Sequence, residues 1–240
     1  MIVPKASDAI HKAWLCRILT GIADDPFLAE NLGFKGGTCA AMRGILDRFS
    51  VDLDFDLLDV QKNKEVQKHL EAAFKRLGLE VKDHSKKVPQ YFLKYPNKQG
   101  QRNTVQFDVN FPAPRSSEYE KIRLVEIDRI VQCQTVPTMF ANKLVATRER
   151  FEKFGSLAGR DIYDIHYFFS QGLSFQEAII EERTGKSADV FLRELRDFIE
   201  QHFNRTIIDQ DLNVLLPTEK FHQIRSFILQ ETLGFLNQAR

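Results

Sequence analysis

Apolar and polar residues alternate one by one in a short segment of the N-terminal half. Because successive side chains of a β-strand point to opposite faces, this period of two predicts a strand with an apolar face and an acidic face. The apolar face is expected to pack into a core. The segment is SVDLDFDL, with Val51, Leu53, Phe55 and Leu57 on one face and Ser50, Asp52, Asp54 and Asp56 on the other.

The rest of the N-terminal half mixes helical and strand patterns. An apolar stripe predicts a helix over residues 7–25, and good helix formers that end near Gly78 predict another over 62–80. Residues 31–38 contain three glycines and predict a turn that enters a helix at 39–46. Shorter patterns predict strands at 91–96, 103–111, 124–128 and 130–136.

Helical patterns dominate the chain from Pro137 onward. Pro137, Ser174 and Thr218 are typical helix-start residues. We therefore predict an α+β protein, with a mixed sheet and flanking helices in residues 1–136 and a helical domain in residues 137–240. The helices are expected at 137–153, 160–171, 174–184, 187–203 and 218–238.

The glycine turn and the acidic strand together indicate a ligand site. Gly36 and Gly37 let the backbone approach a ligand closely, and the helix that follows offers unpaired N–H groups to an anion. Carboxylates spaced about 7 Å apart on one strand face suit Mg²⁺. The alternative, an acidic strand face that meets water, is weakened because neighbouring carboxylates repel and aspartate is a poor strand former. Asp108 supplies a third carboxylate if its strand pairs with the acidic one, or else it faces solvent.

Four motifs follow one another in the chain. They are Gly36-Gly37-Thr38, Ser50-Val51-Asp52-Leu53-Asp54, Lys143, and Arg160-Asp161-Ile162-Tyr163-Asp164. In this order they resemble the AbiEii-like nucleotidyltransferases, toxins of type IV toxin–antitoxin and abortive-infection systems within the DNA polymerase β-type superfamily. The resemblance implies a nucleotidyltransferase fold followed by a helical domain that contributes Lys143 and Asp161 to an active-site cleft. It also implies transfer of a nucleoside monophosphate from an NTP, with Mg²⁺ or Mn²⁺, and an antitoxin encoded nearby. In the better-understood members of the family the acceptor is the 3′ end of tRNA, which is the acceptor expected here.

The matched residues then receive expected roles. The expected catalytic residues are Asp52, Asp54, Lys143 and Asp161. The expected metal ligands are Asp52, Asp54 and Asp108, and the expected nucleotide contacts are Gly36, Gly37, Thr38, Ser50 and Lys143. Asp161 would position the lysine or assist deprotonation of the acceptor. The alternatives are a solvated helix lysine and a cluster of ion pairs at a helix start.

A stretch without acidic residues between His84 and Phe107 is a candidate acceptor surface. Basic side chains interleaved with the aromatic residues Tyr91, Phe92 and Tyr95 suit an RNA backbone and its unstacked bases. The alternative is an exposed hairpin whose lysines protect a sheet edge. The basic residues are Lys86, Lys87, Lys94, Lys98 and Arg102.

Composition adds limits to this interpretation. The formal net charge is +1, so nucleic acid must be bound by a local patch. Three scattered cysteines, no signal peptide and no apolar run of about 18 residues indicate a cytoplasmic protein without a membrane partner. Two alternatives stay open for the function. The enzyme could modify a protein or a small molecule such as an antibiotic, or the chain could be an inactive relative that binds nucleotide.

Overall fold

The computed structural model describes residues 1–84 and 89–239. It divides into two compact units that we treat separately. The sheet unit comprises Met1–Ala113 and Tyr119–Gln134, and the helical unit comprises Pro114–Glu118 and Thr135–Arg240. None of the described helices combines the length and the apolar character needed to cross a bilayer.

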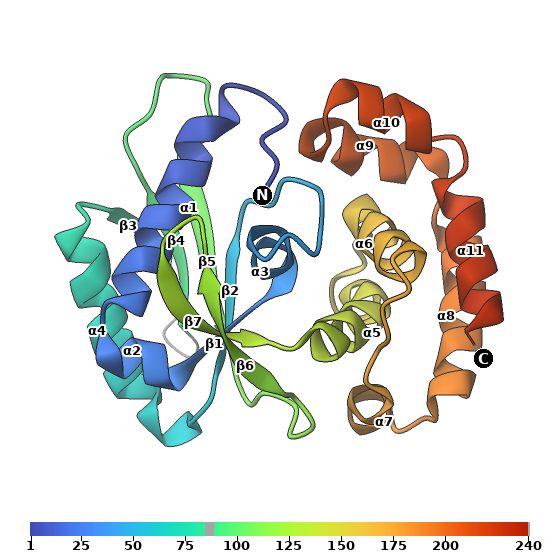
Figure 1. The fold of residues 1–240 in the computed structure, drawn as a ribbon, viewed down its shortest axis with the longest axis horizontal. Helices are drawn as coiled ribbons and strands as arrows, with labels where there is room; N and C mark the ends of the chain where they lie inside the picture. The colour runs from blue at the N-terminus through green and yellow to red at the C-terminus, as the bar shows by residue number, and fades with distance from the viewer. Residues whose placement is uncertain (85–88, 240) are drawn as a thin grey trace. The chain divides into compact units, whose positions relative to one another are not determined.

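The sheet unit is built on one seven-stranded sheet with the order β3-β4-β5-β2-β1-β7-β6 (Figure 1). Two pairings, β2 with β5 and β1 with β7, are parallel, and the other four are antiparallel. The strands are β1 (Leu32–Lys35), β2 (Leu53–Leu57), β3 (Glu80–His84), β4 (Gln90–Lys94), β5 (Thr104–Asn110), β6 (Tyr119–Leu124) and β7 (Arg129–Gln134).

Helices cover both faces of this sheet, but unequally. In Figure 1, α1, α2 and α4 lie along one face, and α3 lies at the other. On the first face the rings of Phe34, Phe55 and Phe107 stack across the three central strands, and Phe74 of α4 packs edge-on against Phe107. The helices are α1 (Asp8–Ala23), α2 (Pro26–Asn31), α3 (Gly36–Met42), the 3₁₀ turn η1 (Val60–Lys62) and α4 (Asn63–Arg76).

The helical unit contains seven α-helices within the described residues. Helix α6 packs against α5, α9 and α11. Gly159 at the start of α6 permits a close approach to α9, since a Cβ there would lie 2.5 Å from the Ile207 carbonyl oxygen. The helices are α5 (Val136–Phe154), α6 (Gly159–Ser170), α7 (Glu177–Thr184), α8 (Ala188–His202), α9 (Arg205–Leu215), α10 (Thr218–Ile224) and α11 (Ile228–Gln238).

The predicted fold class is confirmed, with a mixed sheet first and a helical part after it. Two details of the sequence prediction are wrong. Of the predicted strand at 124–128, only Leu124 lies in a strand, as the last residue of β6, and residues 125–128 form a turn. The single helix predicted at 218–238 is two helices, α10 and α11. The structure also adds α2, α9, β1, β3 and β6, which the patterns did not indicate. The predicted domain boundary between residues 136 and 137 stays a prediction.

Candidate active site

The acidic strand of the sequence is β2, but it is shorter than predicted. It begins at Leu53, so Asp52 lies one residue before the strand and Asp54 and Asp56 lie within it. Leu53 and Phe55 are buried on the apolar face. Because side chains alternate along a strand, Asp54 and Asp56 point away from that core.

Strand pairing extends this acidic face across the centre of the sheet. Lys35 of β1 is the register partner of Asp54, and Asp54 is the register partner of Asp108 on β5. Residues directly opposite each other on neighbouring strands share a face. The side chains of Lys35, Asp54 and Asp108 therefore form one line across three strands. Asp56 lies two residues after Asp54 on the same face of β2, and we call the carboxylates of Asp54, Asp56 and Asp108 the aspartate row.

Asp56 is held by hydrogen bonds from several directions and is fully buried. Its Oδ1 accepts from Lys35 Nζ at 2.6 Å, and its Oδ2 accepts from the Tyr119 hydroxyl at 2.8 Å and from Gln134 Nε2 at 2.6 Å. A Cβ at Gly33 would lie 2.3 Å from the Tyr119 ring, so glycine is required for that ring to cross β1. Asp56 thus fastens the ends of the β6–β7 hairpin to β2.

The two glycines of the predicted turn are the first residues of α3, since the helix begins at Gly36 and not at residue 39, and Gly36 lies directly beside Asp54. Gly36 has a φ of 76°, and a Cβ on it would lie 2.6 Å from Asp54 Oδ2. Both the backbone conformation and the close contact favour glycine at this position. A Cβ on Gly37 would lie 2.7 Å from an Arg48 terminal nitrogen and 3.1 Å from Ser50 Oγ. The structure therefore brings the turn and the Ser50–Asp54 segment together.

Thr38 takes a supporting position in this arrangement. Its side chain is fully buried, and its hydroxyl donates a hydrogen bond to the main-chain oxygen of Asp52. This bond ties α3 to the segment that carries the aspartates. A nucleotide contact through Thr38 stays a prediction.

Two buried side chains near this segment were missed from the sequence. Arg48 is 2% exposed and donates to the Phe49 carbonyl oxygen at 2.8 Å. His11 of α1 is also buried, with Nε2 2.8 Å from the Val51 carbonyl oxygen and Nδ1 2.6 Å from the Tyr95 hydroxyl. Burial lowers the pKa of His11 to about 4, with the Val51 carbonyl opposing the shift and the Arg102 charge adding to it. Neither residue carried a local pattern that could have revealed its partner.

Asp108 sits in an unfavourable electrostatic position for a carboxylate. Burial raises its pKa, although the amides of Gln106 and Gln90 and the charge of Lys35 act in the opposite direction. Gln106 Nε2 donates to Oδ2 at 2.7 Å. Oδ1 is buried and makes no hydrogen bond to any residue that the structure describes. A buried, unsatisfied carboxylate oxygen is costly and indicates a missing partner.

These features fit a divalent cation. The unsatisfied oxygen of Asp108 and the close approach of Gly36 to Asp54 Oδ2 place carboxylate oxygens at one line of the sheet. Across the described ranges, no set of three or more His, Cys, Asp or Glu side chains forms a metal cage. Mg²⁺ does not require such a cage, because it is often bound by one or two carboxylates together with water and substrate phosphates.

The helical unit holds a second charged group, built around Lys143 of α5. Lys143 Nζ lies 2.7 Å from Asp161 Oδ1 and 2.9 Å from Asp164 Oδ2, and Arg150 lies 3.3 Å from Asp161 Oδ2. Both aspartates are on α6 and are fully buried. Burial alone would raise the pKa of Asp161, but the charges of Lys143 and Arg150 hold it below its ordinary value. We call these four residues the lysine cluster.

The sequence motif that ends at Asp164 is thus divided between two partners. Asp161 and Asp164 contact Lys143, whereas Arg160 lies 3.4 Å from Asp211 of α9 and its main-chain N–H donates to the same carboxylate. A solvated Lys143, one of the alternatives, does not describe this structure. The catalytic roles of Lys143 and Asp161 stay predictions.

Comparison with known proteins decides the family. The sequence model described as nucleotidyl transferase AbiEii toxin, type IV TA system, matches residues 17–231. The chain belongs to the AbiEii nucleotidyltransferase toxin family. It is therefore a nucleotidyltransferase, as predicted, and its membership in a type IV toxin–antitoxin family implies an NTP substrate and an antitoxin partner. A search of curated proteins finds no match to the sequence.

Solved structures share the fold of this AbiEii family member. A candidate nucleotidyltransferase from H. pylori has 19% identity and a TM-score of 0.58, and the alignment covers 98% of this chain and 99% of that chain. JHP933 from Helicobacter pylori has 18% identity and a TM-score of 0.55, with 99% and 96% covered. MenT4, a nucleotidyltransferase toxin from Mycobacterium tuberculosis, has 15% identity and a TM-score of 0.57, with 96% and 84% covered.

An AbiEii enzyme also needs a surface for its acceptor, and the structure revises the predicted one. Tyr91 and Tyr95 are buried in the core, so their rings cannot stack on bases, whereas Phe92 is partly exposed. Lys94 pairs with Glu80 at 3.0 Å. Lys98 and Arg102 are exposed beside the β4–β5 turn. Lys86 and Lys87 lie outside the described residues.

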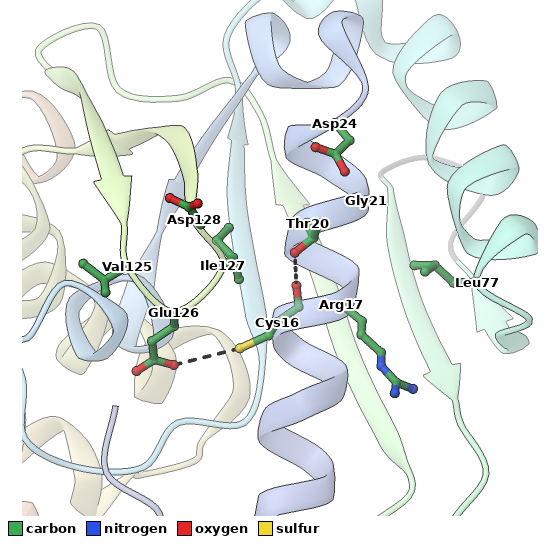
Figure 2. A pocket seen from close by; sticks show the side chains of 10 residues that line it. All are labelled: Cys16, Arg17, Thr20, Gly21, Asp24, Leu77, Val125, Glu126, Ile127 and Asp128. Carbon is green, nitrogen blue, oxygen red and sulfur yellow. Dashed lines mark hydrogen bonds between the residues drawn. The ribbon is translucent and has the colours of Figure 1, made fainter.

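A separate hollow of about 550 Å³ opens between α1 and the β6–β7 turn (Figure 2). Its three carboxylates have cationic partners, since Asp24 pairs with Arg129, Glu126 with Lys12, and Asp128 with Arg123. None of the predicted site residues of the AbiEii motifs lines it. The lining residues are Cys16, Arg17, Thr20, Gly21, Asp24, Leu77, Val125, Glu126, Ile127 and Asp128.

Proposed function

We propose that this AbiEii protein is a metal-dependent nucleotidyltransferase toxin that transfers a nucleoside monophosphate from an NTP to the 3′ end of tRNA and thereby inhibits growth. The observation that carries the proposal is the line of carboxylates beside the glycine turn. Asp54 is in register with Asp108, and Asp54 Oδ2 lies against Gly36. A turn that admits a phosphate and carboxylates that admit a cation are the two parts that nucleotidyl transfer requires.

The proposed metal ligands are Asp52, Asp54 and Asp108. A bound Mg²⁺ or Mn²⁺ would neutralise charge on the triphosphate and on the attacking oxygen. The chain's own contribution is positional. The hydrogen bond from Thr38 to the Asp52 carbonyl oxygen and the hydrogen bond from His11 to the Val51 carbonyl oxygen fix the segment that enters β2.

The proposed nucleotide contacts in the sheet unit are grouped next to Asp54. Gly36 and Gly37 carry no side chains of their own, and the side chains of Asp54, Arg48 and Ser50 lie close to them. Backbone N–H groups and a hydroxyl are suitable donors to β- and γ-phosphate oxygens. Thr38 belongs to this proposed set because its hydrogen bond to the Asp52 carbonyl oxygen holds the start of α3 in place.

Lys143 is the proposed cation for the triphosphate. Two carboxylates at 2.7 and 2.9 Å hold its ammonium group, so it presents a fixed charge instead of a mobile one. A charge that is already held in place does not have to be reoriented as the transition state forms, so the free-energy cost of reorganisation is smaller. Asp161 is proposed to position Lys143, and a role in deprotonating the acceptor hydroxyl is a further part of the proposal.

The test uses each of the four α-labelled NTPs with Mg²⁺ and three acceptor conditions: total tRNA, the protein alone, and an aminoglycoside. We expect label on tRNA, its loss in EDTA, and its loss in Asp52→Ala. Label on the protein or on the aminoglycoside would mean that the acceptor is a protein or a small molecule instead of tRNA. An absence of label under all conditions would support an inactive nucleotide-binding relative and overturn the proposal.

A further inference from the structure

Lys35 occupies a position that the transfer chemistry described above does not use. It is the last residue of β1, directly before the glycine turn, and its register partner is Asp54. Its Nζ lies 2.6 Å from Asp56 Oδ1, and its side chain is 18% exposed. The ammonium group is therefore anchored within the same strand line as the proposed metal ligands.

The charge of Lys35 acts on more than its direct partner. Asp54, its register partner, and Asp108, the register partner of Asp54, lie on the same face of the sheet as Lys35, so its charge attracts both carboxylates. Asp56 does not need Lys35 as its sole partner, because Tyr119 and Gln134 both donate to Oδ2. The lysine is thus placed where its charge reaches all three carboxylates of the aspartate row.

We propose that Lys35 is a positioning residue that supplies a fixed positive charge to the aspartate row and thereby limits how tightly the row binds a divalent cation. A row of carboxylates without an internal cation would bind metal more strongly, because like charges on the ligands add to the attraction. Lys35 reduces this attraction and keeps the carboxylates in place before metal and NTP arrive. The inference rests on the proposed function, since it assumes that a divalent cation binds at the row.

This charge has a consequence that a structural lysine would not have. Replacing Lys35 with Met removes a positive charge that repels the cation, so metal affinity should rise. Replacing Asp56 with Asn removes a negative charge, so affinity should fall. Changing both residues restores the charge balance of the row and should bring the affinity back toward that of the wild type. A lysine that only holds the fold would lower metal affinity when removed, or leave it unchanged.

The experiment measures binding of Mn²⁺ to the nucleotide-free full chain by electron paramagnetic resonance of the free ion. The variants are Lys35→Met, Asp56→Asn, the double variant, Lys35→Arg and Asp54→Asn. Lys64→Met is the matched control, because Lys64 is exposed on α4 of the same unit and gives the same charge change. We expect Lys35→Met to bind Mn²⁺ about three- to thirtyfold more tightly, and Lys35→Arg and Lys64→Met to bind like the wild type.

The outcomes separate this inference from the proposed function. If the wild type binds Mn²⁺ no better than Asp54→Asn, the proposed metal site fails and the inference fails with it. If the wild type binds through Asp54 but Lys35→Met binds equally or more weakly, only the inference is overturned. Should Lys35→Met not fold, Asp56→Asn and the double variant decide. Weaker binding in the first and recovery in the second support the proposal, and any other pattern overturns it.

Discussion

Both units place a lysine against buried aspartates, but the two groups differ in charge balance. In the lysine cluster, Lys143 and Arg150 face Asp161 and Asp164, so cations and carboxylates are equal in number. In the sheet unit, Lys35 faces the three carboxylates of the aspartate row. The pKa values follow this difference, because that of the buried Asp161 is lowered while that of Asp108 is raised.

The comparison distinguishes a closed ionic group from an open one. Buried charges are tolerated when they are paired, and the lysine cluster meets that condition. The aspartate row retains an unsatisfied oxygen on Asp108. A perturbed carboxylate with an unmet partner is typical of a functional site, so the sheet unit is where we expect ligands to arrive. The lysine cluster is where we expect stability to depend most on a single side chain.

The largest expected effect comes from removing one carboxylate of the aspartate row. Asp54→Asn should reduce nucleotidyl transfer by at least about 10²- to 10³-fold, because the carboxylate is needed for the cation that stabilises the transition-state charge. The fold should persist, since Asp54 lies outside the apolar core. Label transfer and growth inhibition are the measurements. Asp128→Asn is the control, because Asp128 is an exposed acid of the same unit. Equal activity in the two variants would mean that the row is not the active site.

Removing the shared cation of the lysine cluster should mainly lower the stability of the protein. Lys143→Met leaves Asp161 and Asp164 buried without their shared cation, which should lower the free energy of unfolding by about 3–5 kcal/mol. Lys153→Met on the same helix removes an exposed ion pair with Glu149 and should cost about 1 kcal/mol or less. Urea unfolding of the two variants tests the difference.

Lys143→Arg separates the charge of this residue from its geometry. The arginine keeps the charge, so it should recover much of the stability, but a planar fork replaces a compact ammonium group and should restore transfer poorly. Unfolding of Lys143→Met and Lys153→Met at the same urea concentration would show that the cluster is not a closed structural group. Full transfer activity in Lys143→Arg would remove the requirement for an ammonium group.

Acid should act on the sheet unit before the helical unit. The pKa of His11 is lowered from 6.5 to about 4, so between these values the unfolded chain binds a proton that the folded chain does not. Stability is therefore lost as pH falls from about 6.5 to about 4, by about 3 kcal/mol in total. The pKa of Asp161 lies below 3.8, so its contribution is present above 3.8 and is lost only at lower pH.

The chain offers a separate probe for each unit. Its single tryptophan, Trp14 of α1, stacks on Tyr95 and reports on the sheet unit by fluorescence. Far-UV circular dichroism is weighted toward the helical unit. In urea titrations at pH 7 and pH 5, the fluorescence midpoint should fall more than the dichroism midpoint. In His11→Gln this pH-dependent difference should disappear, and a difference that persists would assign acid sensitivity to another group.

Local pattern was enough to select the candidate residues that lie close in the chain. Gly36, Gly37, Asp52 and Asp54 are candidates on the sequence alone because turn residues and alternation act over a few positions, and the structure places Gly36 against Asp54. The longest helices, α1, α5 and α8, were predicted for the same reason. β1 was missed because it has only four residues and contains Gly33, which is depleted in strands.

The remaining features depend on contacts between distant residues, which no local pattern records. His11 meets Val51 at a separation of 40 residues, and Asp56 meets Gln134 at a separation of 78. The false strand at 124–128 has the apolar alternation of a strand. In the structure Asp128 has a φ of 52°, a left-handed conformation that belongs to a turn.

The smallest expected effect concerns the acceptor and asks which unit binds it. If the sheet unit binds RNA through Lys94, Lys98 and Arg102, changing all three to Gln should weaken binding across many RNA sequences. The log–log dependence on salt should become shallower by about 0.7–0.9 for each phosphate that is no longer neutralised. The decrease in affinity should be modest, because Lys94 already pairs with Glu80 and two of the three aromatic rings are buried.

The matched control changes three exposed lysines of α4, Lys64, Lys68 and Lys75, to Gln. It removes the same charge from the same unit, so any general electrostatic effect should appear in both triple variants. Only a specific contact surface should make the Lys94–Lys98–Arg102 variant the weaker binder, with Mn²⁺ binding unchanged in both. Equal affinities and equal salt slopes would exclude these three residues as the acceptor surface. RNA binding would then have to depend on the helical unit, and the corresponding lysine and arginine changes there would be the next to measure.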